Sequence, residues 1–254
     1  MHLQLRPRGV LIALEGIDGA GKTTQAGLLE EWLRPTGIQV IRTKEPTDGP
    51  WGRLLRESAS KGRLSPSDEL HAFLEDRREH VTRLINPGLQ AGGVVIVDRY
   101  YFSTAAYQGV RGHDPEELIR KNEEFAPPPD LLVLLDISPR EAIGKIRERG
   151  DTGNLFEREE DLSRSAAIFA KLSPPYLLKI DGTRAREAIS SKIVHAVFKL
   201  PAFEATSRDL HGAPPPFPVS DKDRERFMAV QRIVMDRALS PAEKVAAVRR
   251  RAPP

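Results

Sequence analysis

The feature that most constrains this chain is a glycine-rich loop at residues 16–23, Gly-Ile-Asp-Gly-Ala-Gly-Lys-Thr, which matches the pattern GxxxxGK[ST]. The apolar run 10–14 before it is typical of a buried strand, and residues 24–33 after it carry apolar side chains at helical spacing. Such a loop turns successive backbone N–H groups toward one anion, while its lysine and threonine serve phosphate and magnesium. The order therefore predicts binding of a nucleoside triphosphate. The predicted ATP-binding residues are Gly16, Ile17, Asp18, Gly19, Ala20, Gly21, Lys22, Thr23 and Thr24.

The rest of the chain up to about residue 200 alternates between two patterns. Apolar runs predict further strands at 38–41, 94–97, 131–135 and 176–180, and helical periodicity predicts helices at 69–85, 115–124, 139–149, 162–172 and 185–198. This alternation indicates an α/β fold of three layers around a five-stranded parallel sheet. Ligands of such sheets lie at the carboxyl ends of strands. The polar residues at those ends are Lys44, Glu45, Asp98, Arg99, Asp136 and Asp181.

The last fifty residues have a different texture. We expect a proline-rich linker at 201–220 and a helical tail at 221–254, following a domain at 1–200. In the tail, Phe227, Val230 and Val234 share a helical face, and Ser240 with Glu243 forms a capping-box pattern before a second helix. We interpret the tail as a helical hairpin packed on its own domain or on a dimer partner, with a partner-recruiting module as the alternative.

Composition excludes several classes of protein. The 254 residues include no cysteine, which excludes disulfides, thiolate metal sites and a cysteine nucleophile, and favours a reducing cytoplasm. No apolar run approaches the roughly 20 residues that span a bilayer, and the first apolar run is too short for a signal peptide. The net charge of +3 comes from the tail, since residues 1–200 are balanced. We therefore expect neither membrane nor nucleic-acid binding.

Three clusters point to the second substrate. Residues 98–109 read Asp-Arg-Tyr-Tyr-Phe-Ser-Thr-Ala-Ala-Tyr-Gln-Gly directly after a strand, and residues 73–77 read Phe-Leu-Glu-Asp-Arg on a helix. The third is Asp18, a carboxylate inside an anion-binding loop, where we expect it to accept a hydroxyl group of a second substrate. Together with Glu15, these residues resemble the thymidylate kinase family over about residues 9–200. The resemblance implies a nucleoside monophosphate kinase fold, ATP-dependent phosphorylation of dTMP to dTDP with Mg2+, and a homodimer.

The resemblance also implies roles in binding dTMP. Phe73 matches the aromatic residue that stacks on thymine, Arg77 the arginine that donates to a thymine carbonyl, and Tyr107 the tyrosine that excludes a 2′ hydroxyl. Either Ser103 or Thr104 would present a polar group to the base. The implied dTMP-binding residues are Asp18, Phe73, Arg77, Arg99, Ser103, Thr104, Tyr107 and Gln108. Alternatively, Phe73 and Tyr107 are packing residues, and Arg77 and Arg99 pair structurally with Asp76 and Asp98.

Further implied roles concern phosphate and metal. Arg99 would bind the acceptor phosphate through hydrogen bonds from its guanidinium. Asp98 and Thr23 would hold Mg2+, and Glu45 is a further candidate ligand of the metal. Lys22, Arg99 and Asp98 are therefore the expected catalytic residues. Residues 181–183 would lie beside adenine. A monophosphate oxygen is already ionised at neutral pH, so no catalytic base is needed, and His80 is expected to be structural.

The chain departs from the family pattern in two places. In the expected lid at 147–158, Leu155 stands where the family often has arginine, which leaves Arg147, Arg149 and Arg158 as candidates for the catalytic lid arginine. Residues 47–50 also differ from the family's Gly-Gly-Thr, which affects one contact to the acceptor phosphate. Two alternatives therefore stay open: a kinase for another nucleotide or deoxynucleoside, and a nucleotide-binding regulator without turnover.

Overall fold

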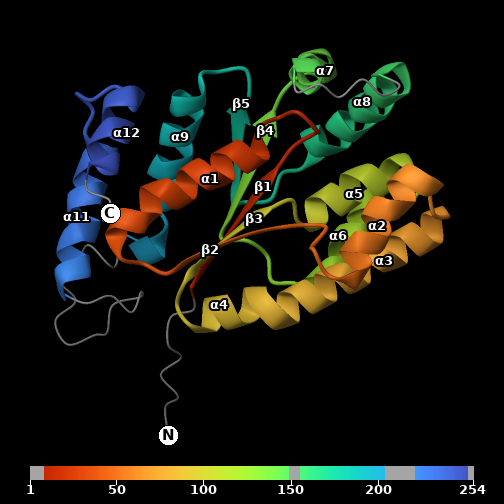
Figure 1. The fold of residues 1–254 in the computed structure, drawn as a ribbon, viewed down its shortest axis with the longest axis horizontal. Coiled ribbons are helices and arrows are strands. Elements are labelled where there is room, and N and C mark those ends of the chain that lie inside the picture. Colours follow the sequence, from red (N-terminus) through yellow and green to blue (C-terminus); the bar gives the residue numbers. More distant parts are fainter. Residues whose placement is uncertain (1–8, 149–154, 204–220, 251–254) are drawn as a thin grey trace, which may run out of the picture.

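A five-stranded parallel sheet forms the centre of the computed structural model, which describes residues 9–148, 155–203 and 221–250 (Figure 1). The strand order is β2-β3-β1-β4-β5. The strands are β1 (Val10–Glu15), β2 (Val40–Lys44), β3 (Val94–Asp98), β4 (Leu131–Asp136) and β5 (Leu177–Asp181). All four strand pairings are parallel, which confirms the predicted sheet.

The central strands are apolar because helices cover both of their faces. Every residue of β1 and β3 is buried, as expected for inner strands of a parallel sheet. Their register pairs Leu14 with Asp98, and Lys44 of β2 also pairs with Asp98. The loop that follows β1 therefore begins beside the polar residues that end β2 and β3, which is the arrangement that a site at the carboxyl edge requires.

Helices form the outer two layers (Figure 1). Helices α1 and α9 pack together on one side of the sheet, and α3, α4, α5 and α6 lie on the other. Helix α2 packs on α3, and α8 packs on α5 and α7. The bounds are α1 (Lys22–Leu33), η1 (Arg34–Thr36, 3-10), α2 (Pro50–Lys61), α3 (Pro66–His80), η2 (Val81–Ile85, a π turn), α4 (Asn86–Gln90), α5 (Tyr101–Val110), α6 (Pro115–Glu123), α7 (Pro139–Glu148), α8 (Leu155–Lys171) and α9 (Arg186–Phe198).

Four segments differ from the sequence prediction. Helices α2 and α5 were not predicted, and β2 runs from Val40 to Lys44 instead of 38–41. Helix α5 is buried along most of its length, so its apolar residues show no single face. Strand β2 is an edge strand in which half-buried and exposed residues are mixed. Its polar end therefore shows no continuous apolar run from which a strand could be predicted. Helix α8 begins at Leu155, earlier than the predicted residue 162.

The tail folds as two helices against the same core. Helices α11 (Asp221–Met235) and α12 (Pro241–Arg249) pack on α9, and they also contact η1 and α1 respectively (Figure 1). The ring of Phe227 is fully buried and stacks on those of Phe198 and Phe203, at centroid distances of 5.4 and 5.8 Å. Ser240 and Glu243 form the predicted capping box. The predicted linker lies largely outside the described residues.

A membrane-crossing helix would need a long apolar stretch. Across the described ranges, no helix combines the length and the hydropathy that crossing a bilayer demands.

Candidate active site

The glycine-rich loop after β1 is built to hold an anion. Gly19 has φ 83° and lies so close to α7 that a Cβ there would come within 2.5 Å of the Ala142 carbonyl oxygen. Gly21, at φ 95°, is the N-cap of α1, and no side chain caps that helix end. The first N–H groups of α1 are consequently available to a phosphate. Glycine is required at both positions by conformation, and at Gly19 also by space.

Lys22 is folded inward over this loop. Its Nζ donates to the carbonyl oxygens of Gly16 at 3.0 Å and Ile17 at 2.9 Å, and the side chain is buried. Burial and the nearby Arg99 cation together lower the pKa of Lys22 to about 7, against the opposite effect of the surrounding carboxylates. A polyanion entering the loop would favour the charged ammonium, so Lys22 is suited to respond to phosphate.

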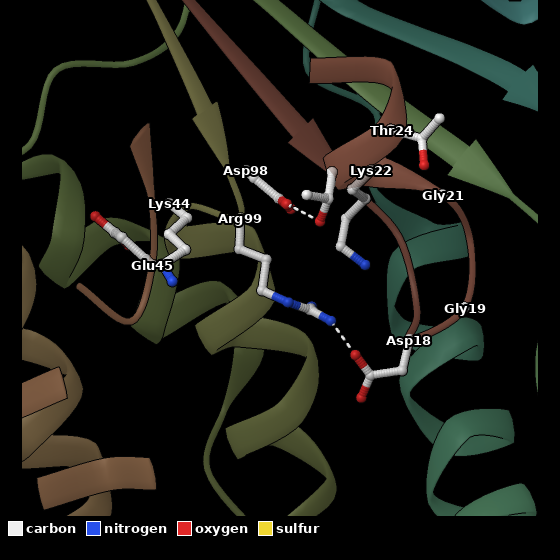
Figure 2. Close-up of a pocket in the computed structure, with 10 residues that line it drawn as sticks. Asp18, Gly19, Gly21, Lys22, Thr24, Lys44, Glu45, Asp98 and Arg99 are labelled. Atoms are coloured by element: carbon white, nitrogen blue, oxygen red, sulfur yellow. Dashed lines mark hydrogen bonds and ion pairs between the residues drawn. The ribbon is translucent and has the colours of Figure 1, made fainter. Parts of the chain in front are cut away.

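A polar cavity of about 240 Å³ lies in front of the loop (Figure 2). At its floor the Thr23 hydroxyl donates to the Asp98 carboxylate, with 2.5 Å between the oxygens. This pair of oxygen donors suits a magnesium ion that takes its other ligands from phosphate and water. In the described part of the chain, no group of three or more acidic, histidine or cysteine side chains could hold a metal by itself. The lining residues are Asp18, Gly19, Gly21, Lys22, Thr23, Thr24, Lys44, Glu45, Asp98 and Arg99.

Arg99 stands between this cavity and a second one. Its guanidinium donates to the Asp18 carboxylate and, at 3.1 Å, to the Ser103 hydroxyl, and it lies 5.2 Å from the centre of the Tyr107 ring. Burial alone would lower the pKa of Arg99, but the acidic groups around it raise that pKa above its ordinary value. Its backbone φ is 68°, a left-handed conformation. The side chain is thus a permanent cation aimed at the junction of the two cavities.

The second cavity, of about 200 Å³, is more aromatic. Asp18, Glu45 and Arg99 line both cavities and so connect them. Tyr107 accepts the Asp18 N–H at 3.0 Å, and burial raises its pKa to about 12, so its hydroxyl stays protonated at neutral pH. The lining residues are Asp18, Glu45, Pro46, Phe73, Arg77, Arg99, Tyr100, Ser103, Thr104 and Tyr107. This cavity matches an aromatic base next to a phosphate site.

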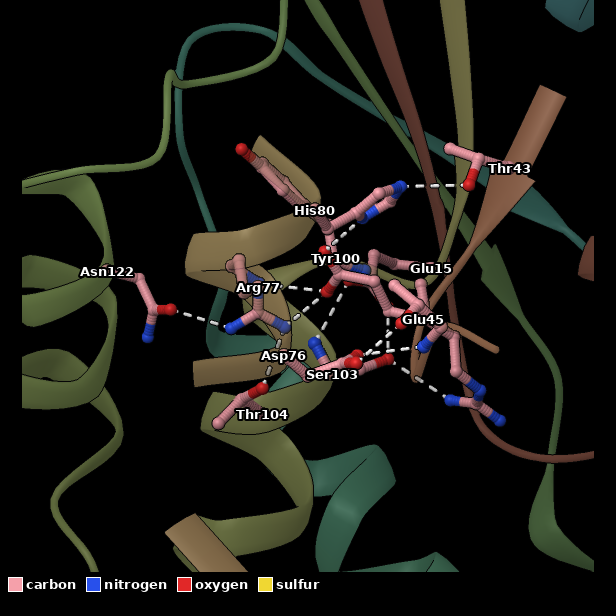
Figure 3. A network of polar contacts seen from close by, with 12 residues as sticks. Glu15, Thr43, Glu45, Asp76, Arg77, His80, Tyr100, Ser103, Thr104 and Asn122 are labelled. Carbon is pink, nitrogen blue, oxygen red and sulfur yellow. Dashed lines mark hydrogen bonds and ion pairs between the residues drawn. The ribbon is translucent and has the colours of Figure 1, made fainter. Parts of the chain in front are cut away.

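Arg77 is fixed in the wall of the second cavity by a buried network (Figure 3). Its Nε and Nη2 both donate to Glu45 Oε2, at 2.9 and 2.5 Å, and Nη1 donates to Asn122 Oδ1 at 2.6 Å. His80 holds the other Glu45 oxygen at 2.9 Å and contacts the Thr43 hydroxyl. Burial would raise the pKa of Glu45, but the Arg77 charge and the bond from His80 outweigh it and lower that pKa. His80 is therefore structural, as predicted.

The network corrects two sequence interpretations. Arg77 pairs with Glu45 rather than with Asp76, whose carboxylate accepts the N–H and hydroxyl of Thr47. Arg99 pairs with Asp18 rather than with Asp98. Both Glu45 oxygens are occupied by Arg77 and His80, so the structure does not offer Glu45 to a metal.

The structure also separates three neighbouring candidates on α5. Thr104 Oγ1 accepts from Arg77 at 3.0 Å and lines the second cavity. The Ser103 hydroxyl donates to Glu15 and accepts from Arg99, and Ser103 also lines the second cavity. Gln108 is fully buried and donates to Glu69 at 2.9 Å. The structure therefore does not bring Gln108 to the second cavity.

Of the six polar residues that end the strands, four gather at the site: Lys44, Glu45, Asp98 and Arg99. Asp136 instead pairs with Lys179 at 3.2 Å, and Asp181 accepts from Thr183. Arg147 is exposed on α7, whereas Arg149 and the side chain of Arg158 lie outside the described residues. Sequence reasoning missed Asn122 as an acceptor for Arg77, and nothing in its local sequence marks it.

Comparison with known proteins agrees with this geometry. The sequence profile of the thymidylate kinase family matches residues 14–193. Thymidylate kinase of Xanthomonas campestris pv. campestris (strain B100) is 49% identical over 197 residues, covering 78% of this chain and 86% of the relative. That of Xylella fastidiosa (strain M12) is 48% identical over 200 residues, covering 79% and 92%. That of Xanthomonas oryzae pv. oryzae (strain PXO99A) is 45% identical over 214 residues, covering 84% and 92%. The chain therefore belongs to the thymidylate kinase family.

Proposed function

We propose that this protein transfers the terminal phosphoryl group of ATP to dTMP, giving ADP and dTDP. The observation that carries the proposal is the pair of connected cavities, one beside the glycine-rich loop and one lined by Phe73, Arg77 and Tyr107. Arg99 lies at their junction, where an acceptor phosphate would meet a donor phosphate. Family membership supports the same reaction.

The side chains can supply what the transfer needs. The loop N–H groups and Lys22 would hold the outer phosphates of ATP, and Arg99 would orient the dTMP phosphate for in-line attack. Mg2+ would be held by Thr23 and Asp98 and would neutralise charge on the transferred group. Because the attacking phosphate oxygen is already ionised, these residues position and neutralise without removing a proton.

The base cavity supports selection of deoxythymidine. We infer that Phe73 stacks on thymine, that Arg77 and Thr104 address its polar edge, and that Asp18 accepts the 3′ hydroxyl. Tyr107 then closes the 2′ side of the sugar. A ribonucleotide would lose contacts in this cavity because a fixed polar wall leaves mismatched groups unpaired.

Three arginines are our candidates for the lid cation, namely Arg147, Arg149 and Arg158. Alanine variants of each arginine, assayed for kcat, identify the acting one by a loss of at least tenfold.

We further infer that the protein forms a homodimer, acts on small-molecule substrates in the cytoplasm and has no nucleic-acid partners. Light scattering on the purified protein measures the dimer.

The direct test is to incubate the purified protein with ATP, Mg2+ and each nucleoside monophosphate in turn, and to quantify the diphosphates. We expect selective conversion of dTMP to dTDP. Preferred conversion of another nucleotide would support a different kinase, and tight dTMP binding without product would support a regulator. In Tyr107→Ala, discrimination against ribonucleotides should weaken if the tyrosine closes the sugar site.

A further inference from the structure

Glu15 is a buried acid that the proposed transfer does not use. It is the last residue of β1, and its side chain is fully buried between the glycine-rich loop and the start of α5. One carboxylate oxygen accepts the N–H groups of Tyr100 and Ser103, at 2.8 and 3.0 Å, and the other accepts the Ser103 hydroxyl at 2.5 Å (Figure 3). Three donors from another element thus converge on this one carboxylate.

These bonds cap helix α5 from outside. Its N-cap, Tyr100, offers no side-chain cap of its own. The first N–H groups of a helix lack partners within it, and an anion there is favoured by the helix dipole. Glu15 supplies both the acceptor and the charge. The start of α5 is therefore fixed to the end of β1, next to the phosphate site.

Arg99 lies directly before this capped turn, and its backbone and its side chain are each held by a hydrogen bond. Its N–H donates to the carbonyl oxygen of Leu14 at 3.0 Å, and its guanidinium donates to the Ser103 hydroxyl at 3.1 Å. A serine hydroxyl has one hydrogen, which Ser103 gives to Glu15, so its lone pairs face Arg99. Within the described residues, Arg99 is also the one non-glycine residue with positive φ, a conformation that its surroundings must hold.

We propose that Glu15 is a positioning residue that holds Arg99 in place for the phosphate of the acceptor nucleotide, acting through Ser103 and the start of α5. The inference rests on the proposed function, in which Arg99 binds the dTMP phosphate. Glu15 itself does not touch the substrate. Its effect is consequently confined to ligands that carry a phosphate.

The charge state of Glu15 adds a pH dependence. Burial raises the pKa of Glu15 to about 7, against the bonds from Ser103 and Tyr100 and the charge of Arg99. The charged groups that face it are Arg99 and Lys22, whose own pKa is lowered to about 7. The ionised carboxylate is the better acceptor for its three donors. Positioning of Arg99 therefore weakens as the pH falls through neutrality.

The test compares dTMP with thymidine, which lacks the phosphate, by calorimetry of wild type and Glu15→Gln without ATP. At pH 8 we expect Glu15→Gln to bind dTMP roughly tenfold more weakly and thymidine within about twofold of wild type. At pH 6 the difference in dTMP affinity should shrink, because the wild-type acid becomes neutral. Titration of the dTMP phosphate is common to both proteins and cancels in their ratio.

A matched control is Glu69→Gln. Glu69 is buried and bonded to Gln108 and Arg111 at the other end of α5, at 2.9 and 2.7 Å. This variant also removes one buried negative charge that contacts α5, so a change in thermal stability is allowed. The ratio of dTMP to thymidine affinity should stay at the wild-type value.

Equal losses for dTMP and thymidine in Glu15→Gln, or no loss for either, would overturn the positioning role. If Glu15→Gln does not fold, Ser103→Ala removes the link to Arg99 while keeping both backbone bonds of Glu15. That variant should lose dTMP affinity selectively, and unchanged affinity would refute the proposal. Absence of dTMP binding by the wild-type protein would instead reject the proposed function itself.

Discussion

The two arginines that line the second cavity, Arg77 and Arg99, are held in opposite ways. Arg77 is 2% exposed, and its partners Glu45, Asn122 and Thr104 are all buried. The side chain of Arg99 is 19% exposed, and its carboxylate partner Asp18 is 51% exposed. The guanidinium of Arg77, which would contact the base, is thus fixed before a substrate binds. The guanidinium of Arg99, which would bind the phosphate, can exchange its partner Asp18 for that phosphate.

This difference suits their proposed tasks. Because Arg77 is already fixed, it would bind the base without a further loss of side-chain conformational entropy. A mismatched base would leave buried polar groups unpaired. An exposed ion pair such as that of Arg99 with Asp18 contributes little stability. Arg99 can therefore leave Asp18 for a phosphate at small cost, and Asp18 becomes available to a sugar hydroxyl.

The largest effect should come from removing the carboxylate of the buried pair. Glu45→Gln leaves the Arg77 cation buried without its counter-charge, and we expect a loss of about 3–5 kcal/mol in the free energy of unfolding. Asp18→Asn, the same change at the exposed pair, should cost less than about 1 kcal/mol. Denaturant titration of both variants measures the contrast, and equal losses would remove the distinction between the two arginines.

Next in size is the loss of Arg99, the arginine proposed to bind the acceptor phosphate. Arg99→Ala should lower kcat/KM for dTMP roughly 10²- to 10³-fold, because a charged donor to the acceptor phosphate is lost. Arg99→Lys keeps the charge but not the two-pronged geometry, so we expect only partial recovery. Steady-state kinetics at saturating ATP provide the readout. Wild-type activity in Arg99→Ala would exclude Arg99 from the reaction.

The pH dependence of stability should distinguish the carboxylates beside the two arginines. The pKa of Glu15 is raised to about 7 from 4.5, so the stability linked to its protonation is present below pH 4.5 and is lost as the pH rises through 7. That loss amounts to up to about 3 kcal/mol. Glu45 has a lowered pKa, so its contribution is present above pH 4.5 and is lost in acid.

Thermal melts between pH 5 and 8 check these opposite signs. The Glu15→Gln variant should lose less stability than wild type as the pH rises over this range. An identical pH profile in the two proteins would mean that Glu15 does not titrate near neutrality in the folded state.

A smaller effect than that of Glu45→Gln is expected at the neutral partner of Arg77. Asn122→Ala leaves one buried guanidinium N–H without an acceptor and should cost about 1–3 kcal/mol of stability. Because Glu45 still holds the guanidinium, KM for dTMP should rise only a few-fold. Combined melting and kinetic measurements decide this, and a loss as large as that of Glu45→Gln would contradict the ranking.

Much of the fold was predictable because its signals are local. The apolar runs of β1 and β3 and the glycine-rich loop lie within short windows, and the capping box of α12 spans four residues. Helix α5 was missed because burial on nearly all sides erased its periodicity. The candidates at the first cavity came mainly from the glycine-rich loop and those at the second from the family resemblance, and most of them line the two cavities.

The contacts that position the site residues could not be predicted in the same way. Arg77 is bonded to Glu45 and Asn122, which lie 32 and 45 positions away, and Ser103 to Glu15, 88 positions away. Each of these pairs depends on the final packing of separate elements. A sequence pattern indicated that Arg77 is important but not which carboxylate balances its charge.

The helical tail has a practical consequence for anyone shortening this protein. The family profile ends at residue 193, which invites truncation near residue 200. The Phe227 ring from α11 covers Phe198 and Phe203, and α12 rests on α1, the helix that begins at the phosphate loop. A shortened fragment would expose these aromatic rings and remove the contact between α12 and α1. Expression and crystallisation are therefore best pursued with α11 and α12 retained, with surface tags attached beyond them.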